Sequence, residues 1–140
     1  MKIKWKIKMN LEKLNECIEK RRANHSRARE AIYNVLMMSD ECLNICDIID
    51  KLSETYPKKI SLNTLYRHLN FFIECKLIIV IQDDFKKAYY HLRESSPMTF
   101  CICTKCTNVS KLNLVNFIDL ELVDDVEFIT FHKKCNKCTS

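Results

Sequence analysis

The sequence predicts an α+β protein with two domains: a helical N-terminal domain that ends in a β-hairpin, and a small cysteine-rich α/β domain. Three observations predict this fold class. Apolar residues recur at helical spacing up to about residue 75. Two runs rich in Ile, Val and Tyr follow at residues 77–82 and 87–92, and two CxxC pairs lie within the last 40 residues. We place the first domain at residues 1–93 and the second at 98–140, because Glu-Ser-Ser-Pro between them has the composition of a linker.

Composition excludes several protein classes. The chain has 140 residues, of which 47% are hydrophobic, with nine cysteines and no glycine. Without glycine the backbone cannot form the close phosphate-binding loops of Rossmann and P-loop proteins. The longest apolar run, residues 77–81, is far shorter than the roughly 18 residues that cross a bilayer, and no secretory signal opens the sequence. We therefore expect a cytoplasmic protein with reduced thiols and no membrane partner.

The first three helices of the N-terminal domain are placed by apolar spacing and by capping residues. Residues 1–10 contain KIKWKIKM, in which lysine alternates with apolar residues, and an edge strand, an arm or a tail all remain open there. A helix is expected from Leu11, with apolar residues at helical spacing. Ser26 is the expected N-cap of the second helix and Asn44 of the third, because both side chains accept hydrogen bonds from first-turn N–H groups. The apolar stripes are expected to include Met38 and Ile49.

The fourth helix is the candidate recognition helix of a winged helix-turn-helix. It begins at Ser61 or Asn63 and is followed by the two β-like runs, which residues 83–86 join with turn chemistry. Three helices followed by a two-stranded hairpin are typical of this module, whose last helix enters the major groove of DNA. The predicted outward face of the helix carries Asn63, Thr64, Arg67 and His68. A base or phosphate contact by His68 is expected there.

Positive charge is concentrated at the N-terminus. Residues 1–29 hold ten Lys or Arg and three Glu, a balance of +7, whereas the remaining 111 residues hold thirteen and fifteen, a balance of −2. Such an asymmetry is what binding to the phosphates of DNA requires, and a solvated surface is the alternative. On charge alone both interpretations stay open.

Four cysteines of the second domain form a predicted structural zinc site. The CxxC pairs are Cys103 with Cys106 and Cys135 with Cys138, and each such turn places two sulfurs on one metal. The domain is expected to contain strands near residues 100–102, 109–112 and 126–132 and a helix near 114–122. A domain of about 40 residues needs a staple, and zinc supplies on the order of 10 kcal/mol of folding free energy. The alternative is a redox CxxC at a helix N-terminus, and we expect no helix to start after either pair.

The other five cysteines are not expected in this zinc site. Cys101 alternates with Cys103 along a strand, so its side chain is expected on the opposite face. The remaining four lie in or beside helical patterns, where an isolated cysteine is usually a small buried hydrophobe. They are Cys17, Cys42, Cys46 and Cys75.

Several motifs together resemble the ferric uptake regulator family of metal-dependent bacterial transcription regulators. They are HSRAREAIYNVL for the first winged-domain helix, ISLNTLYRHLNFF for the recognition helix, KKAYYHL for the second wing strand, and the two CxxC pairs. The resemblance implies an obligate homodimer with an N-terminal DNA-binding domain and a C-terminal dimerisation domain stapled by zinc. At matching positions it implies groove contacts by Tyr66 and Arg67, with Asn63 and Thr64 beside them, and it places Arg29 near the DNA backbone.

The departures from the family pattern concern the regulatory metal. The family usually carries a histidine-rich tract before the first CxxC, whose imidazoles bind the metal that sets DNA affinity, but residues 97–100 read Pro-Met-Thr-Phe. Two further ligand positions hold Lys111 and Glu127, and a lysine repels a cation. Cys42 and His91 fall near other ligand positions, and with Cys101 they form a hypothetical soft ligand set for zinc, copper(I) or redox chemistry. We therefore expect the regulatory metal site to be atypical or absent.

Three functions remain in view. The first is a dimeric, zinc-containing regulator, not an enzyme, which represses metal or stress genes by binding a double-stranded DNA operator and takes no small-molecule substrate. The second is a thiol-disulfide redox protein that uses a CxxC. The third is a zinc-stabilised interaction protein without DNA binding. Metal analysis with thiol counting distinguishes the first two, and a DNA shift assay distinguishes the first from the third.

Overall fold

A computed structural model gives the chain two compact units. It describes residues 2–94, 97–112 and 125–139. The first unit comprises Met1–Val80 and Tyr90–Arg93, and the second comprises Ile81–Tyr89 and Glu94–Ser140. Because this division runs through the hairpin, the domain limits at residues 93 and 98 stay predictions.

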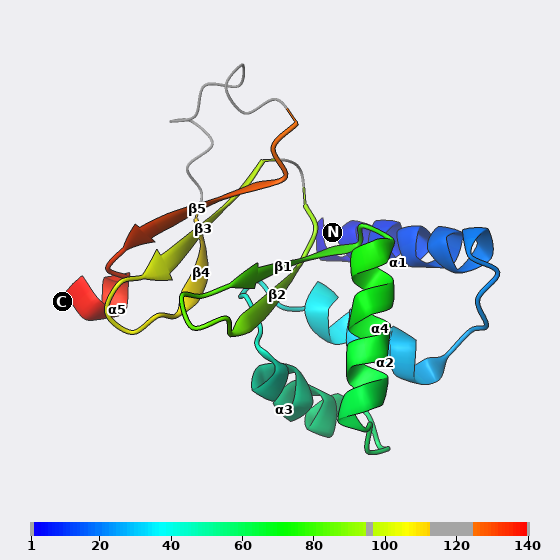
Figure 1. Ribbon diagram of the computed structural model, residues 1–140. Coiled ribbons are helices and arrows are strands. Elements are labelled where there is room, and N and C mark those ends of the chain that lie inside the picture. The colour runs from blue at the N-terminus through cyan, green and yellow to red at the C-terminus, as the bar shows by residue number, and fades with distance from the viewer. Residues whose placement is uncertain (1, 95–96, 113–124, 140) are drawn as a thin grey trace. The chain divides into compact units, whose positions relative to one another are not determined.

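Four helices precede a two-stranded sheet in the chain, which confirms the predicted winged helix-turn-helix order (Figure 1). The elements are α1 Lys2–Lys20, α2 Arg27–Met37, α3 Ile45–Thr55, α4 Leu62–Glu74, β1 Ile78–Gln82 and β2 Ala88–Leu92. The turn between the strands is organised by Asp83, whose carboxylate accepts hydrogen bonds from the N–H groups of Phe85 and Lys87 at 2.8 and 2.9 Å. An aspartate thus closes the turn where glycine is unavailable.

Capping side chains fix where α2, α3 and α4 begin. Ser26, Asn44 and Ser61 each accept a hydrogen bond from the N–H three residues later, at 2.9 to 3.2 Å. The caps at Ser26 and Asn44 are confirmed, and Ser61 rather than Asn63 begins α4. Asn44 completes a capping box, because its own N–H donates to the Asp47 carboxylate at 3.1 Å. These bonds satisfy N–H groups that no helix can satisfy internally.

The core of the first unit lies between α2, α3 and α4. Ile32, Ile48, Leu69 and Phe72 have no exposed surface, and the Phe72 ring lies 5.2 Å from that of Tyr33. Two members of the predicted apolar stripes are outside this core. Met38 is 64% exposed and Ile49 40% exposed, so the expectation that they point inward is wrong.

Residues 2–10 belong to α1, so the edge strand that stayed open for this segment is wrong. The helix runs without a break from Lys2 to Lys20, and its C-terminal half buries Leu14 and Ile18. Trp5, in the other half, is 67% exposed. Alternating lysine and apolar residues give no apolar stripe, but lysine and methionine are good helix formers, so a helix packed at Leu14 can extend to the N-terminus. Among the described residues no helix is long and apolar enough to cross a membrane.

A disulfide joins α1 to the end of α4. Cys17 lies in α1 and Cys75 is the C-cap of α4, with 6.2 Å between their Cα atoms and a sequence separation of 58. The prediction that they are separate buried thiols is wrong, since both are half-buried and bonded to each other. An ion pair lies beside the disulfide, in which Arg21 donates to Glu74 at 2.9 Å.

The second unit contains a three-stranded sheet in the order β4-β3-β5, shown in yellow to red in Figure 1. Its elements are β3 Met98–Cys103, β4 Val109–Leu112, β5 Phe128–Lys133 and the short helix α5 Asn136–Thr139. The three predicted strands are confirmed, whereas the helix predicted near residues 114–122 lies outside the described residues. Strand β3 is antiparallel to β4 and parallel to β5, and all six of its residues are buried. A buried central strand explains why MTFCIC reads as an apolar run.

Candidate metal centre and nucleic-acid interface

The parallel pairing of β3 with β5 brings the two CxxC pairs to one end of the sheet. Cys103 is the last residue of β3 and lies opposite Lys133, the last residue of β5. Each strand runs directly into its own CxxC segment. The second segment enters α5, and the N–H of Thr104 donates to the carbonyl of Lys133 at 3.2 Å, which holds the two segments together.

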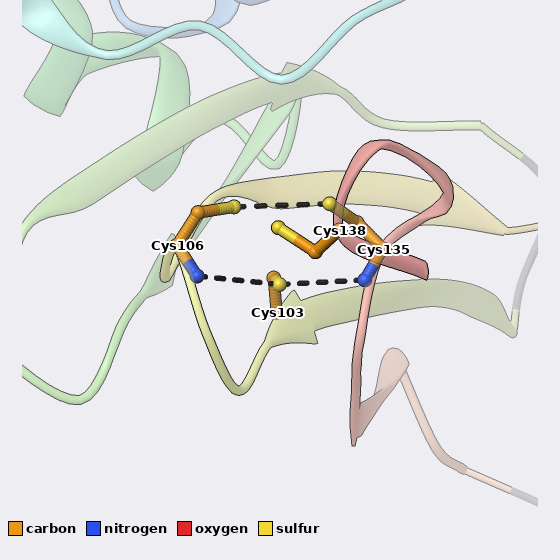
Figure 2. A group of neighbouring side chains, drawn as sticks. All are labelled: Cys103, Cys106, Cys135 and Cys138. Atoms are coloured by element: carbon orange, nitrogen blue, oxygen red, sulfur yellow. Dashed lines mark hydrogen bonds between the residues drawn. The ribbon is translucent and has the colours of Figure 1, made fainter. Parts of the chain in front are cut away.

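The sulfur atoms of Cys103, Cys106, Cys135 and Cys138 all lie within 4.8 Å of one another (Figure 2). Those of Cys106 and Cys135 are 3.7 Å apart. Four sulfurs at zinc–sulfur distances of 2.3 Å in a tetrahedron would be about 3.8 Å apart. Among the described residues this is the one cluster of three or more metal-ligating side chains. The donor set and its spacing fit a structural zinc ion.

Backbone N–H groups surround the sulfur of Cys103. It accepts hydrogen bonds from the N–H groups of Lys105, Cys106 and Cys135 at 3.3 to 3.4 Å, and two of them are drawn in Figure 2. These donors, that of Cys106 first, lower the pKa of Cys103 to about 5, so the thiolate is present at neutral pH. The neighbouring Cys135 has the opposite effect on Cys138, whose pKa rises to about 12. A divalent cation among the sulfurs would stabilise all four as thiolates.

The geometry does not favour a redox CxxC. A four-residue helix, α5, does follow Cys135, so the expectation that no helix starts after either pair is wrong for the second pair. However, the sulfurs of the two pairs converge on one another. Convergence of two CxxC pairs is typical of a closed structural metal site, in which no sulfur is left to attack a substrate.

The hypothetical soft ligand set is not part of this cluster. Cys42, His91 and Cys101 are all buried. The Cys101 thiol donates to the carbonyl of Lys133 at 3.6 Å. Both ring nitrogens of His91 face backbone carbonyls, Nδ1 that of Leu92 at 2.7 Å and Nε2 that of Asp40 at 3.4 Å. The set therefore stays a prediction.

Two residues of the second unit at or near the family's regulatory positions are engaged in other contacts. Lys111 on β4 forms an ion pair with the carboxylate of Glu94. In the tract before the first CxxC, the Thr99 hydroxyl donates to the carbonyl of Leu112 at 2.5 Å. An ammonium group paired with a carboxylate leaves neither group available to a cation.

The exposed face of α4 forms a groove together with α2. Tyr66 is 44% exposed, Asn63 and Arg67 are exposed, and Thr64 is half-buried because its N–H and hydroxyl contact the Ser61 cap. The groove has a volume of about 460 Å³. Its lining residues are Arg29, Asn63, Tyr66, Arg67, His68, Asn70, Phe71 and Glu74. Five of the six predicted DNA-contacting residues therefore line this groove. The sixth, Thr64, does not line it but follows Asn63 in the sequence.

Arg29 is held over the groove by α2 and an aromatic ring. Its guanidinium lies 4.2 Å from the centre of the Phe71 ring, and Nη1 donates to the carbonyl of Asn24 at 2.7 Å. Burial and the neighbouring charge of Arg67 lower the pKa of Arg29. Within the described part of the chain, its buried Nε has no hydrogen-bond acceptor. A cation fixed in this way is suited to receive a phosphate oxygen.

His68 does not lie on the outward face as predicted. It is only 5% exposed and borders the groove from below. Burial, followed by the positive charges of Arg29 and Arg67, lowers the pKa of His68, so the imidazole is neutral at pH 7. Helical spacing alone does not predict this burial.

We expect Cys103→Ser to abolish tight zinc binding and to unfold the second unit. Loss of one thiolate opens the cluster, and structural zinc contributes on the order of 10 kcal/mol to folding. Zinc content and far-UV circular dichroism measure the effect. Cys46→Ser, at an exposed position of α3, serves as the control and should change neither. A second unit that keeps its stability after complete removal of zinc would contradict the prediction.

We expect His68 to make the protein less stable in acid. Its pKa in the folded state lies below the unfolded value of 6.5, so unfolding takes up a proton and stability is lost as the pH falls through 6.5. In His68→Gln, the free energy of unfolding should fall less steeply between pH 7 and 5. Urea unfolding across that range measures the slope, with exposed His25→Gln as control. Equal slopes in all three proteins would exclude the role of His68.

Comparison with known proteins identifies the family. The model of the ferric uptake regulator family matches residues 20–123, and comparison with curated protein sequences gives no match. Among solved structures, the Helicobacter pylori ferric uptake regulator is 21% identical, with a TM-score of 0.78 over 95% of this chain and 93% of that chain. The Vibrio cholerae regulator is 18% identical, with a TM-score of 0.65 over 86% and 98%.

A zinc uptake regulator in complex with zinc and DNA is also similar, at 20% identity and a TM-score of 0.57 over 96% of this chain and 95% of that chain. At these identities the solved structures show the fold. The family match spans 104 of 140 residues, from the end of α1 through α4 and the first CxxC, and leaves the second CxxC beyond it. Since the match covers well over half of its length, the chain belongs to the ferric uptake regulator family.

Proposed function

We propose that this chain is a homodimeric, zinc-stapled transcription regulator of the cytoplasm, which binds operator DNA and represses metal-homeostasis or stress genes. The observation that carries the proposal is the groove along α4, in which two arginines lie side by side over an exposed helix face. Family membership supports the same activity. A site that concentrates positive charge on a capped, exposed helix is complementary to a DNA groove with its flanking phosphates.

The groove residues divide into two roles. Arg67 and Asn63 are exposed on the N-terminal half of α4, where a recognition helix contacts base edges, and arginine is the best bidentate partner of guanine. Tyr66 contacts a thymine methyl or a phosphate from the same face. Arg29 receives a backbone phosphate, because it lines the groove and its ring contact with Phe71 holds the guanidinium in place. His68 supports this surface from beneath.

The second unit supplies the homodimer contact in this proposal. Strand β5 forms one edge of the described sheet, and its apolar side chains Phe128 and Ile129 are only half-buried, with Phe131 36% exposed. A partner subunit that covers this strand would bury them. Two recognition helices related by a two-fold axis would then read half-sites about one helical turn apart, or a multiple of it.

Regulation of the proposed dimer does not use a metal at the family's second-domain positions. Lys111 occupies one of these positions, and its pairing with Glu94 leaves neither group available to a cation. The remaining candidate regulatory site is the soft set of Cys42, His91 and Cys101, which has the thiol and imidazole chemistry that zinc or copper(I) prefers.

Arg67→Ala is expected to lower operator affinity by about 1 to 3 kcal/mol and to relax base preference. Arg29→Ala should instead weaken binding to all sequences about equally and reduce the salt slope by about one. Fluorescence anisotropy on the promoter region of its own gene, at several salt concentrations, measures both effects. Lys105→Ala removes the same charge from the second unit and is the control. If no duplex is bound in a salt-dependent manner, the proposed function is wrong. The zinc-stabilised interaction protein without DNA binding would then be the remaining candidate.

Equilibrium metal titration tests the candidate regulatory set. If Cys42 and His91 ligate a second ion, Cys42→Ser and His91→Ala should each remove one binding event while the structural zinc remains. The same variants should then lose the metal-dependent part of their DNA affinity. Unchanged stoichiometry and unchanged affinity in both variants would eliminate this site.

A further inference from the structure

We propose that the Cys17–Cys75 disulfide is a redox-responsive staple, and that its formation raises affinity for DNA by fixing the recognition helix on α1. The inference rests on the proposed DNA-binding function. It assigns a role to two cysteines that lie outside the zinc cluster and outside the candidate regulatory set. The disulfide is the one such bond among the nine cysteines, and the structure describes all nine.

The staple closes at the end of the proposed DNA surface. Cys75 is the C-cap of α4 and directly follows Glu74, which lines the groove. One turn earlier, Phe71 lines the same groove and lies 4.2 Å from the Arg29 guanidinium. The position of Arg29, and with it the position of the phosphate it receives, therefore depends on how the last turn of α4 is held.

Among the described residues, two polar contacts lie beside the disulfide between α1 and this turn. Arg21 pairs with Glu74 at 2.9 Å with side chains 42% and 62% exposed, and its guanidinium lies 6.0 Å from the Phe71 ring. An exposed ion pair contributes little to stability. Opening of the disulfide therefore removes the covalent link between α1 and the end of α4 and leaves an exposed ion pair beside it.

The two sulfurs are placed for exchange. Both cysteines are half-buried, so neither residue is enclosed in the core of the unit. In the cytoplasm, where we place this chain, stable structural disulfides are rare and those that form are usually transient or redox-sensing. The four zinc-site cysteines are protected from the same chemistry when their thiolates are bound to metal, so the Cys17–Cys75 pair responds first.

The reaction is a thiol–disulfide exchange with a low-molecular-weight disulfide. The thiolate of one cysteine attacks a sulfur of the small disulfide, forms a mixed disulfide and releases one small thiol. The thiolate of the other cysteine then attacks the sulfur of its protein partner, closes the bond between Cys17 and Cys75 and releases the second small thiol. The protein loses two electrons and two protons, and the small disulfide gains them. Excess small thiol reverses both steps.

The closed disulfide also holds the positive charges of α1 in place relative to the groove. Helix α1 carries Lys4, Lys6, Lys8, Lys13 and Lys20, a large part of the positive charge of residues 1–29. Joined to α4, these lysines keep a fixed position relative to the groove, within the first unit. A preorganised surface loses less conformational entropy on binding than one that must be ordered by the DNA.

The experiment compares the full-length, zinc-loaded protein after equilibration with oxidised or reduced glutathione. Mass spectrometry of non-reduced peptides reports the disulfide, zinc analysis confirms that the cluster is intact, and anisotropy on one operator duplex reports affinity. We expect the oxidised protein to bind about tenfold more tightly, within the range usual for coupling between two sites. The double variant Cys17→Ser/Cys75→Ser should bind as the reduced protein does and ignore the redox buffer, whereas Cys46→Ser should behave as the unmodified protein.

A second measurement separates this inference from the proposed function. Amide hydrogen exchange over residues 71–76, without DNA, should be slower in the oxidised protein, and the double variant should match the reduced form. If neither form binds DNA but their amide hydrogen exchange rates differ, the proposed DNA-binding function is wrong. The disulfide would then still be shown to hold the end of α4. Equal affinity and equal exchange in the two forms would overturn the inference, as would redox sensitivity that persists in the double variant.

Discussion

The parallel pairing of β3 with β5 is the constraint on which the second unit depends. It brings Cys103 and Lys133 to the same end of the sheet, so two CxxC segments that are 32 residues apart meet at one point. Four convergent sulfurs repel one another once all are ionised, because like charges at this separation disfavour one another. A divalent cation removes this repulsion. The metal and the strand pairing therefore stabilise each other, which a domain of only about 40 residues requires.

Local features of the sequence predict most of the fold and the metal cluster. Ser26 and Asn44 cap their helices as expected, because capping depends only on a side chain and the N–H three residues later. The zinc-binding cysteines can be predicted in the same way, because each CxxC pair is a local turn. The extent of α1 was not predictable in this way, because its first turns have no apolar stripe and extend from a half that packs through Leu14.

The features that the sequence does not reveal all arise from tertiary contacts. Cys17 and Cys75 are 58 residues apart, and nothing in either helical pattern indicates that the two sulfurs meet. His68 occupies an outward position by helical spacing, yet it is buried near the charges of Arg29 and Arg67. The pairing of Lys111 with Glu94 joins a strand to a linker residue. A lysine at a ligand position indicated the loss of a metal site, but not which group would neutralise the charge.

The cysteines of this chain have two roles, metal binding in the second unit and disulfide formation in the first, and different sulfurs carry out each role. In the second unit, N–H donors hold Cys103 as a thiolate at neutral pH, which favours metal and would also favour oxidation if the sulfur were left uncoordinated. A zinc ion coordinated by all four sulfurs leaves none of them free to react. In the first unit, Cys17 and Cys75 have no comparable metal site among the described residues, and a disulfide forms between them instead. One chain can therefore contain a permanent sulfur staple in one unit and an exchangeable one in the other, because the number of sulfurs that meet decides which bond forms.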